Sequence, residues 1–123
     1  MAKILIVDDS RTSRRILKEI LTKAGHEIVG EATDGEEGYM KFKELQPDLV
    51  TLDITMPKMD GIEALKLIRR EDENAAVVMI TAAGQTEKMR QAVKYGASEF
   101  VAKPYETYEV TETIEKVLRN EGN

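Results

Sequence analysis

The apolar residues of this chain fall into five short runs, separated by longer stretches in which polar residues dominate. The runs occupy residues 3–7, 27–32, 49–53, 75–80 and 99–102. Short apolar runs rich in β-branched residues are typical of strands that a sheet buries on both faces. The second run holds only Ile28 and Val29 among charged and small residues, so it predicts a more exposed strand at a sheet edge.

Five longer stretches repeat apolar residues at three- and four-residue spacing, which predicts amphipathic helices. They cover about residues 11–24, a stretch ending near 45, a stretch that follows Gly61, 86–95, and a last stretch from Thr107 to about 118. In the fourth of these we expect Met89, Ala92 and Val93 to face inward. Gly25 predicts the end of the first helix, and His26 after it is interpreted as a solvated turn residue.

Strands that alternate with helices predict βαβ units, which build a parallel sheet with helices on both faces. Right-handed crossovers leave few ways to arrange these units, and the exposed second strand suits a sheet edge. We therefore predict an α/β fold with a doubly wound five-stranded parallel sheet in the order 2-1-3-4-5 and five helices. In this order the winding direction reverses between strands one and three.

Chemically reactive side chains stand where four of the predicted strands end. Asp8 and Asp9 follow the first strand, Asp53 closes the third, and Thr81 and Lys103 follow the fourth and fifth. The carboxyl ends of parallel strands lie at one edge of a sheet, where open α/β sheets bind their ligands. Because strands one and three are neighbours in the predicted order, we expect these five residues to share one cleft.

The three carboxylates would repel one another and raise at least one pKa unless a cation neutralised them. Mg²⁺ prefers an all-oxygen site in which it keeps several waters, so the carboxylates are candidate Mg²⁺ ligands. Lys103 offers a positive charge to a phosphoryl group, Thr81 offers a hydroxyl donor, and the backbone N–H near Ala82 offers another donor. Phosphoryl transfer needs such positioning and charge neutralisation, and a carboxylate can be its nucleophile, so Asp53 is interpreted as the acceptor.

Each of these residues also has an ordinary structural interpretation. Asp8-Asp9-Ser10 could cap the first helix, Asp53 could be a turn residue, Thr81 could bond its own backbone, and Lys103 could be a surface lysine. The combination of acid, acid, hydroxyl and amine at four strand ends, in chain order, is what favours a shared site.

Composition narrows the remaining function classes. The 123 residues carry 23 acidic and 18 basic side chains, and the net charge of −5 argues against a nucleic-acid-binding role. Arg11, Arg14 and Arg15 form the densest basic group and are interpreted as a solvated helix face. No apolar run reaches the ~20 residues that cross a bilayer, no signal peptide follows Met1, and cysteine is absent. We therefore expect a cytoplasmic protein that does not insert into membranes.

Four motifs at these strand ends resemble the receiver domain of bacterial and archaeal response regulators. They are Ile-Val-Asp-Asp-Ser at 6–10, Asp-Ile-Thr-Met-Pro-Lys-Met-Asp-Gly at 53–61, Ile-Thr-Ala at 80–82 and Val-Ala-Lys-Pro-Tyr at 101–105. The resemblance runs from about residue 3 to residue 118, and the four motifs are specific as a set. It implies a flavodoxin-like sheet, the same strand order as the pattern predicts.

The resemblance also implies roles for the acidic residues. Asp53 would accept a phosphoryl group from the phosphohistidine of a sensor histidine kinase. Asp9 and Asp53 would bind Mg²⁺, and Asp8 would help largely through water. The main-chain carbonyl of Thr55 would complete the protein ligands of the metal.

Thr81 and Lys103 match the switch hydroxyl and the phosphate-contacting lysine of that family. Phe100 matches its switch aromatic, which turns inward on activation, and many chemotaxis receivers carry Tyr at that position. The phosphorylated state would then change the face formed by the fourth helix, the fifth strand and the fifth helix, where a partner docks.

Within the family the sequence is most similar to the stand-alone receivers of chemotaxis. Residues 1–123 are interpreted as a single receiver domain without an output domain, and as no enzyme beyond its own phosphotransfer and autodephosphorylation. The expected partners are a CheA-like sensor histidine kinase and a FliM-like flagellar motor switch protein or a phosphatase, with the chain itself a monomer. A receiver in another relay, such as sporulation or cell-cycle control, fits the same residues.

Two further function classes share this fold or this chemistry. A flavin-binding carrier would use hydroxyls after the first strand to hold a phosphate, but Asp8 and Asp9 place negative charge there and glycine is absent. An aspartyl-phosphate phosphatase usually carries a second Asp two residues after its nucleophile, where this chain has Thr55. Both alternatives are therefore less favoured than a receiver.

Overall fold

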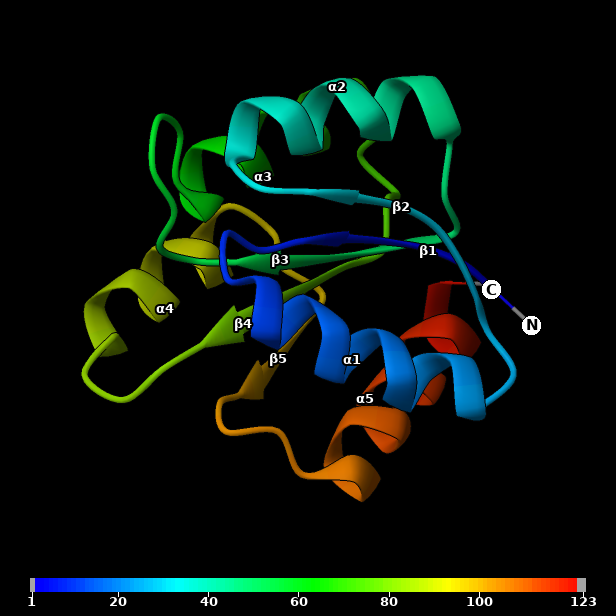
Figure 1. The fold of residues 1–123 in the computed structure, drawn as a ribbon. Coiled ribbons are helices and arrows are strands. Elements are labelled where there is room, and N and C mark those ends of the chain that lie inside the picture. Colours follow the sequence, from blue (N-terminus) through cyan, green and yellow to red (C-terminus); the bar gives the residue numbers. More distant parts are fainter. Residues whose placement is uncertain (1, 122–123) are drawn as a thin grey trace.

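The structure, a computed structural model that describes residues 2–121, is a five-stranded parallel sheet with helices on both faces (Figure 1). The strands are β1 Lys3–Val7, β2 Glu27–Ala32, β3 Leu49–Asp53, β4 Val77–Thr81 and β5 Glu99–Ala102. The helices are α1 Arg11–Lys23, α2 Gly35–Leu45, α3 Gly61–Glu71, α4 Thr86–Lys94 and α5 Thr107–Glu121. The strand order β2-β1-β3-β4-β5 confirms the predicted doubly wound fold.

The sheet separates two apolar cores. Helices α2, α3 and α4 cover one face, and α1 and α5 cover the other (Figure 1). Alternate residues of β1 point into opposite cores: Leu5 and Val7 pack beneath α2, α3 and α4, while Ile4 and Ile6 pack beneath α1 and α5. Strand β2 forms an edge and buries only Ala32 fully, as its polar pattern predicts. Burial of both strand faces is the main force that fixes the register of the central strands.

Helix α4 buries a narrower stripe than its sequence spacing predicts. Ala92 is fully buried and Met89 is partly buried, but Val93 is 63% exposed. The expectation that Val93 faces inward is therefore wrong. Helix α4 lies over the β4–β5 side of the sheet, with α3 as its neighbouring helix, so its opposite flank faces solvent (Figure 1).

The prediction of a solvated His26 is also wrong. This residue is only 7% exposed. Its Nδ1 atom accepts a hydrogen bond from the N–H of Ala2 at 3.1 Å, and its Nε2 atom lies 3.3 Å from Oε2 of Glu115 on α5. Two segments that are distant in sequence bury the ring, so the local pattern after Gly25 contains no sign of it.

Side chains cap the first three helices. The caps are Ser10, Asp34 and Asp60, which accept from the N–H groups of Ser13, Glu37 and Glu63 respectively. Gln85 stands at the same position of α4, but within residues 2–121 its side chain makes no capping hydrogen bond. In the part of the chain that the structure describes, no helix has the length and apolar character that a membrane span requires.

Candidate functional site

Three carboxylates meet at the carboxyl edge of the sheet. Asp53 is the last residue of β3, and Asp8 and Asp9 follow β1, which is its hydrogen-bonded neighbour. One oxygen from each of these residues lies within 4.8 Å of the others. Asp8 and Asp53 are buried, while Asp9 is exposed. The convergence expected from the strand order is therefore present, with Asp9 on the solvent side.

Lys103 brings a positive charge to two of the carboxylates. Its Nζ atom lies 3.1 Å from Oδ2 of Asp53 and 3.1 Å from Oδ2 of Asp8. The contact to Asp53 is also a hydrogen bond. Lys103 follows β5, and β4 lies between β5 and β3, the strand that ends in Asp53. The side chain of Lys103 therefore extends past the end of β4, at Thr81, to reach the acidic pair.

Burial dominates the ionisation of Asp53. Loss of hydration is the largest cause that raises the pKa of its carboxyl group, the charge of Asp8 is the next, and the net pKa rises from 3.8 to about 6. The hydrogen bond and charge of Lys103 oppose this shift. Burial lowers the pKa of Lys103, but the nearby carboxylates of Asp8 and Asp53 outweigh that effect and the net shift is upward. Lys103 is thus fully charged at neutral pH, while burial makes the negative charge of Asp53 costly.

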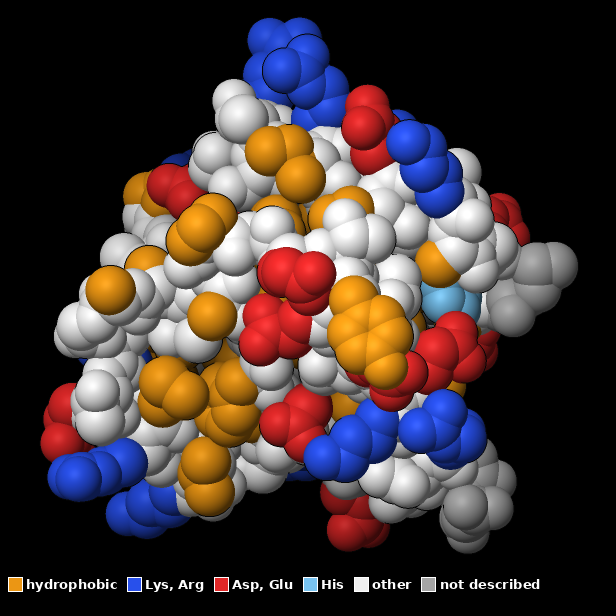
Figure 2. All heavy atoms as spheres, turned by 90° about the horizontal axis from the view of Figure 1, so that it is seen from below, with side chains coloured by type: hydrophobic (Ala, Val, Ile, Leu, Met, Phe, Trp, Pro, Cys, Tyr) orange, Lys and Arg blue, Asp and Glu red, His pale blue; other side chains and the backbone are white. Residues whose placement is uncertain are grey.

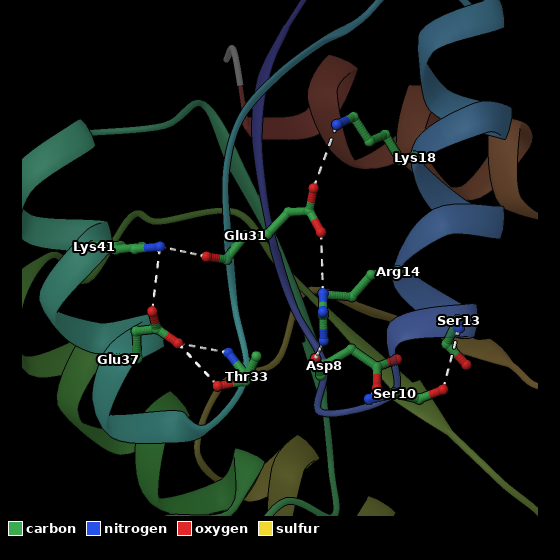
Figure 3. Close-up of polar contacts among 9 residues, drawn as sticks. All are labelled: Asp8, Ser10, Ser13, Arg14, Lys18, Glu31, Thr33, Glu37 and Lys41. Carbon is green, nitrogen blue, oxygen red and sulfur yellow. Dashed lines mark hydrogen bonds and ion pairs between the residues drawn. The ribbon is translucent and has the colours of Figure 1, made fainter.

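The backbone around Asp8 is fixed by charged side chains (Figure 3). The Oδ1 atom of Asp8 accepts a hydrogen bond from the N–H of Ser10 at 2.8 Å. Arg14 donates to the carbonyl oxygen of Asp8 at 2.7 Å and forms an ion pair with Glu31 of β2 at 3.0 Å. The interpretation of Arg14 as part of a solvated helix face is therefore wrong, because this side chain joins α1, β2 and the loop that carries Asp8.

The donor set fits a hard divalent cation. The Oδ2 atom of Asp8 is buried, and within residues 2–121 it meets only the ammonium group of Lys103 and has no hydrogen bond of good geometry. A buried carboxylate oxygen in this position lacks a full set of partners, and one lysine cannot balance three acids. Asp8, Asp9 and Asp53 are the oxygen ligands that a small divalent cation prefers.

The loop after β4 supplies hydroxyl and amide donors, and the side chain of Gln85 contacts them. Its Oε1 atom accepts from the N–H of Ala82 at 2.6 Å and lies 3.1 Å from the hydroxyl of Thr81. Its Nε2 group donates to Oγ1 of Thr55 at 2.7 Å. The hydroxyl of Thr81 also lies 3.3 Å from the carbonyl of Ala82, and its one proton serves one acceptor at a time. The sequence analysis missed Gln85, because an amide in a polar loop forms no recognisable pattern.

The chain matches the response regulator receiver domain over residues 4–115. It belongs to that family. The chemotaxis protein CheY of Thermotoga maritima is 49% identical over 117 residues, which are 95% of this chain and 98% of that one. The CheX–CheY–BeF3–Mg complex of Borrelia burgdorferi has a TM-score of 0.89 at 42% identity, over 94% of this chain and 87% of that one. NtrX of Brucella abortus gives a TM-score of 0.91 at 31% identity, over 98% of this chain but only 27% of NtrX.

As a receiver domain closely related to CheY, the chain is a two-component signalling protein. The match covers all four strand-end motifs, which lie within residues 4–115. The roles of single residues in this receiver remain predictions, and the structure gives the positions on which they depend. The backbone carbonyl of Thr55, expected to bind the metal, lies in the loop that follows Asp53.

Two aromatic residues flank the receiver site at β5. Phe100 is partly buried and packs against the core beneath α2, α3 and α4. Tyr105 packs against the opposite core. Burial raises the pKa of the Tyr105 hydroxyl, and the negative charges of Asp8 and Asp53 raise it further. It has no hydrogen-bond partner among the residues that the structure describes.

Gly61 lets α3 start directly against the end of β3. Its N–H donates to the carbonyl of Ile54 at 2.7 Å. A Cβ atom at this position would overlap the carbonyl oxygen of Asp53 and lie 2.9 Å from Cα of Ile54. The requirement for glycine therefore comes from close backbone approach and not from a turn conformation. This approach holds the backbone at the end of β3 in place.

Proposed function

We propose that this chain is a phosphorylation-activated response regulator of a chemotaxis two-component system, with Asp53 as the phosphoryl acceptor. A carboxylate oxygen of Asp53 attacks the phosphorus of a phosphohistidine on a CheA-like sensor histidine kinase. An O–P bond to Asp53 forms, the P–N bond breaks, and the electron pair of that bond returns to the imidazole. The likeness to chemotaxis proteins over nearly the whole chain supports this assignment.

The bridge that Lys103 makes between Asp8 and Asp53 is the observation that carries the proposal. An ammonium group within 3.1 Å of the acceptor oxygen can transfer its hydrogen bond to an oxygen of the incoming phosphoryl group. Phosphoryl transfer depends mainly on such positioning and on neutralising charge. The arrangement gives the receiver both a nucleophile and a cation to hold the product.

The loop after β4 provides the remaining donors. We assign the hydroxyl of Thr81 and the N–H of Ala82 to two other phosphoryl oxygens, because both donors point to one acceptor atom, Oε1 of Gln85. When the hydroxyl of Thr81 bonds the phosphoryl group, its side chain moves with the loop, and Phe100 turns further inward against the core it already contacts. These two residues form the switch.

Asp8, Asp9, Asp53 and the main-chain carbonyl of Thr55 would hold Mg²⁺, with Asp8 acting largely through water. The chemistry supplied by Mg²⁺ is neutralisation of the acidic cluster, which lets an anionic phosphoryl group approach Asp53. The protein needs no change of fold to bind the metal, since one carboxylate oxygen from each of the three acids already lies within 4.8 Å of the others. The complex of a related CheY with BeF3 and Mg supports the choice of metal.

We place the output surface on α4, β5 and α5. Val93 of α4 is 63% exposed and Tyr108 of α5 is 68% exposed, so both present apolar area to a partner. Figure 2 views the molecule from the side of α1 and α5 and shows apolar side chains interspersed with acidic and basic ones there, whereas α4 covers the other face of the sheet. Such a mixed surface suits a reversible contact with a FliM-like motor switch protein or a phosphatase. A related CheY forms a complex with the protein CheX, which supports docking of a protein partner.

The acceptor is tested by intact-protein mass spectrometry after incubation with acetyl phosphate and Mg²⁺. We expect one phosphoryl adduct on the wild-type chain and none on Asp53→Asn. Asp72→Asn is the matched control, because Asp72 lies after α3 and its carboxylate accepts only from the N–H of Asn74 among the contacts described. An adduct that persists in Asp53→Asn and maps to another residue contradicts the assignment.

A further inference from the structure

The side chain of Gln85 forms hydrogen bonds with residues of the proposed phosphoryl site and does not cap its own helix, α4. The side chains that precede α1, α2, α3 and α5 bond the first turn of their own helix; the α5 cap is Glu106, which accepts from the N–H of Glu109. Gln85 bonds Thr81, Ala82 and Thr55, and all three partners lie outside α4. The carboxamide is thus an additional bond between the β3–α3 loop and the β4–α4 loop.

The acceptor atom of Gln85 occupies the position that the proposed function gives to phosphoryl oxygens. The N–H of Ala82 lies 2.6 Å from Oε1, and the hydroxyl of Thr81 lies 3.1 Å from the same atom. A backbone N–H donates one good hydrogen bond, and a hydroxyl has one proton to donate. Neither donor can therefore serve Gln85 and a phosphoryl group at the same time.

We infer that the Gln85 carboxamide is an internal competitor for the phosphoryl site and must leave it when Asp53 is phosphorylated. This inference rests on the proposed function, because it takes Thr81 and Ala82 as phosphoryl ligands. Gln85 is a positioning residue that sets how readily the receiver accepts the phosphoryl group. It does not take part in the chemical step.

Displacement of Gln85 also links the site to α4. In the unmodified protein its side chain anchors the start of α4 to Thr55, on the loop that follows the acceptor strand. When Thr81 and Ala82 donate to the phosphoryl group, Oε1 of Gln85 loses both of its hydrogen bonds. The side chain of Gln85 is then held only by the hydrogen bond from its Nε2 group to Thr55. The first turn of α4 has no side-chain cap within residues 2–121, and its ion pair between Lys88 and Asp60, at 3.4 Å, is exposed and therefore weak, so the turn can shift. Phosphorylation at β3 thereby reaches the proposed output surface.

Three variants test this inference. Gln85→Ala removes the competitor and leaves the two donors to water. Gln85→Glu keeps an acceptor and strengthens it with a negative charge, since charged acceptors form stronger hydrogen bonds. Gln91→Ala removes the same side chain from the middle of α4, where no described residue forms a hydrogen bond with it, and is the matched control.

The readout is the apparent affinity for beryllofluoride at saturating Mg²⁺, measured by ¹⁵N NMR titration. We expect Gln85→Ala to bind roughly three- to tenfold more tightly than wild type, the factor that corresponds to about one net hydrogen bond. Gln85→Glu should bind more weakly than wild type, and Gln91→Ala should match wild type. Binding by Gln85→Ala that equals or falls below that of Gln91→Ala overturns the inference, because the carboxamide is then either neutral or a ligand of the phosphoryl group.

A second readout needs no phosphoryl analogue. Amide hydrogen exchange of Ala82 in the free protein should be faster in Gln85→Ala than in Gln91→Ala, because the bond to Oε1 is lost. Equal exchange rates overturn the inference even if beryllofluoride affinity changes. If wild type itself binds no beryllofluoride, the proposed function fails, whereas the exchange of Ala82 still tests the contact on its own.

Discussion

The Nζ atom of Lys103 lies 3.1 Å from Oδ2 of Asp53, although 50 residues separate the two in sequence. The parallel sheet makes this contact possible, because it places the ends of β3, β4 and β5 along one edge. The ammonium group lowers the pKa of Asp53, while burial and the charge of Asp8 raise it. Lys103 therefore limits the repulsion between two buried carboxylates, and the proposed function gives it a second role as a contact of the phosphoryl group.

Lys103→Met should destabilise the protein and abolish most phosphorylation. Loss of the cation leaves Asp8 and Asp53 without a charged partner, and we expect unfolding free energy at pH 7.5 to fall by about 1–3 kcal/mol. Phosphorylation of Asp53 by acetyl phosphate should slow by roughly 100-fold or more, since a preorganised charged donor is lost. Urea unfolding in EDTA and mass spectrometry measure the two effects.

Lys116→Met provides the control for Lys103→Met. Lys116 forms an ion pair with Glu99 at 3.1 Å, but its side chain is 57% exposed. An exposed pair of this kind contributes about 0–1 kcal/mol, so stability and phosphorylation should stay close to wild type. Equal losses in the two variants would show that the effect of Lys103 is not specific to the acidic cluster.

Asp53→Asn should stabilise the metal-free protein above pH 6. Burial raises the pKa of Asp53 in the folded state from 3.8 to about 6, so the folded state holds a proton that the unfolded state releases. The cost is absent below pH 3.8, grows as pH rises, and is complete above about pH 6. At pH 7.5 the substitution should therefore add about 1–3 kcal/mol to the unfolding free energy.

The test of Asp53→Asn is urea unfolding of both proteins in EDTA between pH 3.5 and pH 8. The difference between variant and wild type should be near zero at the acidic end and should widen as pH increases. A constant difference across that range would mean that the carboxylate charge is not its cause. In Mg²⁺ the wild type should regain stability, because a ligand that binds only the folded state stabilises it.

Much of the architecture could be predicted from the sequence, because strand and helix periods are local properties of the chain. The apolar runs that end in Asp8, Asp53 and Thr81 also fix which residues meet, since parallel strands share one carboxyl edge. One site formed by the ends of four strands could therefore be predicted from the sequence alone. The order of strands followed from the exposed pattern of β2 and from the handedness of crossovers.

The features that could not be predicted depend on contacts between distant segments. His26 is buried by Ala2 and by Glu115 of α5, and the sequence around residue 26 contains no pattern that predicts either contact. Val93 follows the apolar spacing of its helix, but its side chain is 63% exposed, because α3 packs beside α4 on the other flank. Gln85 lies outside any apolar pattern, and its contacts form because the β3–α3 loop lies close to the β4–α4 loop.

Gly61→Ala should disrupt the acceptor strand, whereas Gly84→Ala should have a small effect. A Cβ at Gly61 would overlap the carbonyl oxygen of Asp53, so α3 or β3 must shift, and we expect a loss of about 2–4 kcal/mol. Gly84 has a φ of +85°, and no described atom outside its chain neighbours lies within 4 Å of a Cβ there. Its substitution costs only the left-handed conformation, about 1 kcal/mol. Thermal unfolding of the two variants measures this contrast, and a smaller loss for Gly61→Ala than for Gly84→Ala would contradict the steric argument.

Arg14→Ala should weaken divalent-cation binding without removing any ligand. Arg14 donates to the carbonyl oxygen of Asp8, and its side chain is only 14% exposed (Figure 3). Without this bond the loop that carries Asp8 is less fixed, so the affinity for Mg²⁺ should fall by roughly three- to tenfold, as expected for loss of a partner that orients a metal ligand. Isothermal titration with MgCl₂ measures the change.

Lys18→Ala separates the contact with Asp8 from the ion pair with Glu31. Lys18 lies 3.4 Å from the same glutamate, but its side chain is 53% exposed and it does not contact Asp8. Its substitution should leave Mg²⁺ affinity unchanged. Glu31→Ala removes the shared acid, and Arg14→Ala should still lower Mg²⁺ affinity in that background, because the bond to the Asp8 carbonyl is independent of Glu31. If the effect of Arg14→Ala disappears there, the arginine acts through the ion pair and not through the loop of Asp8.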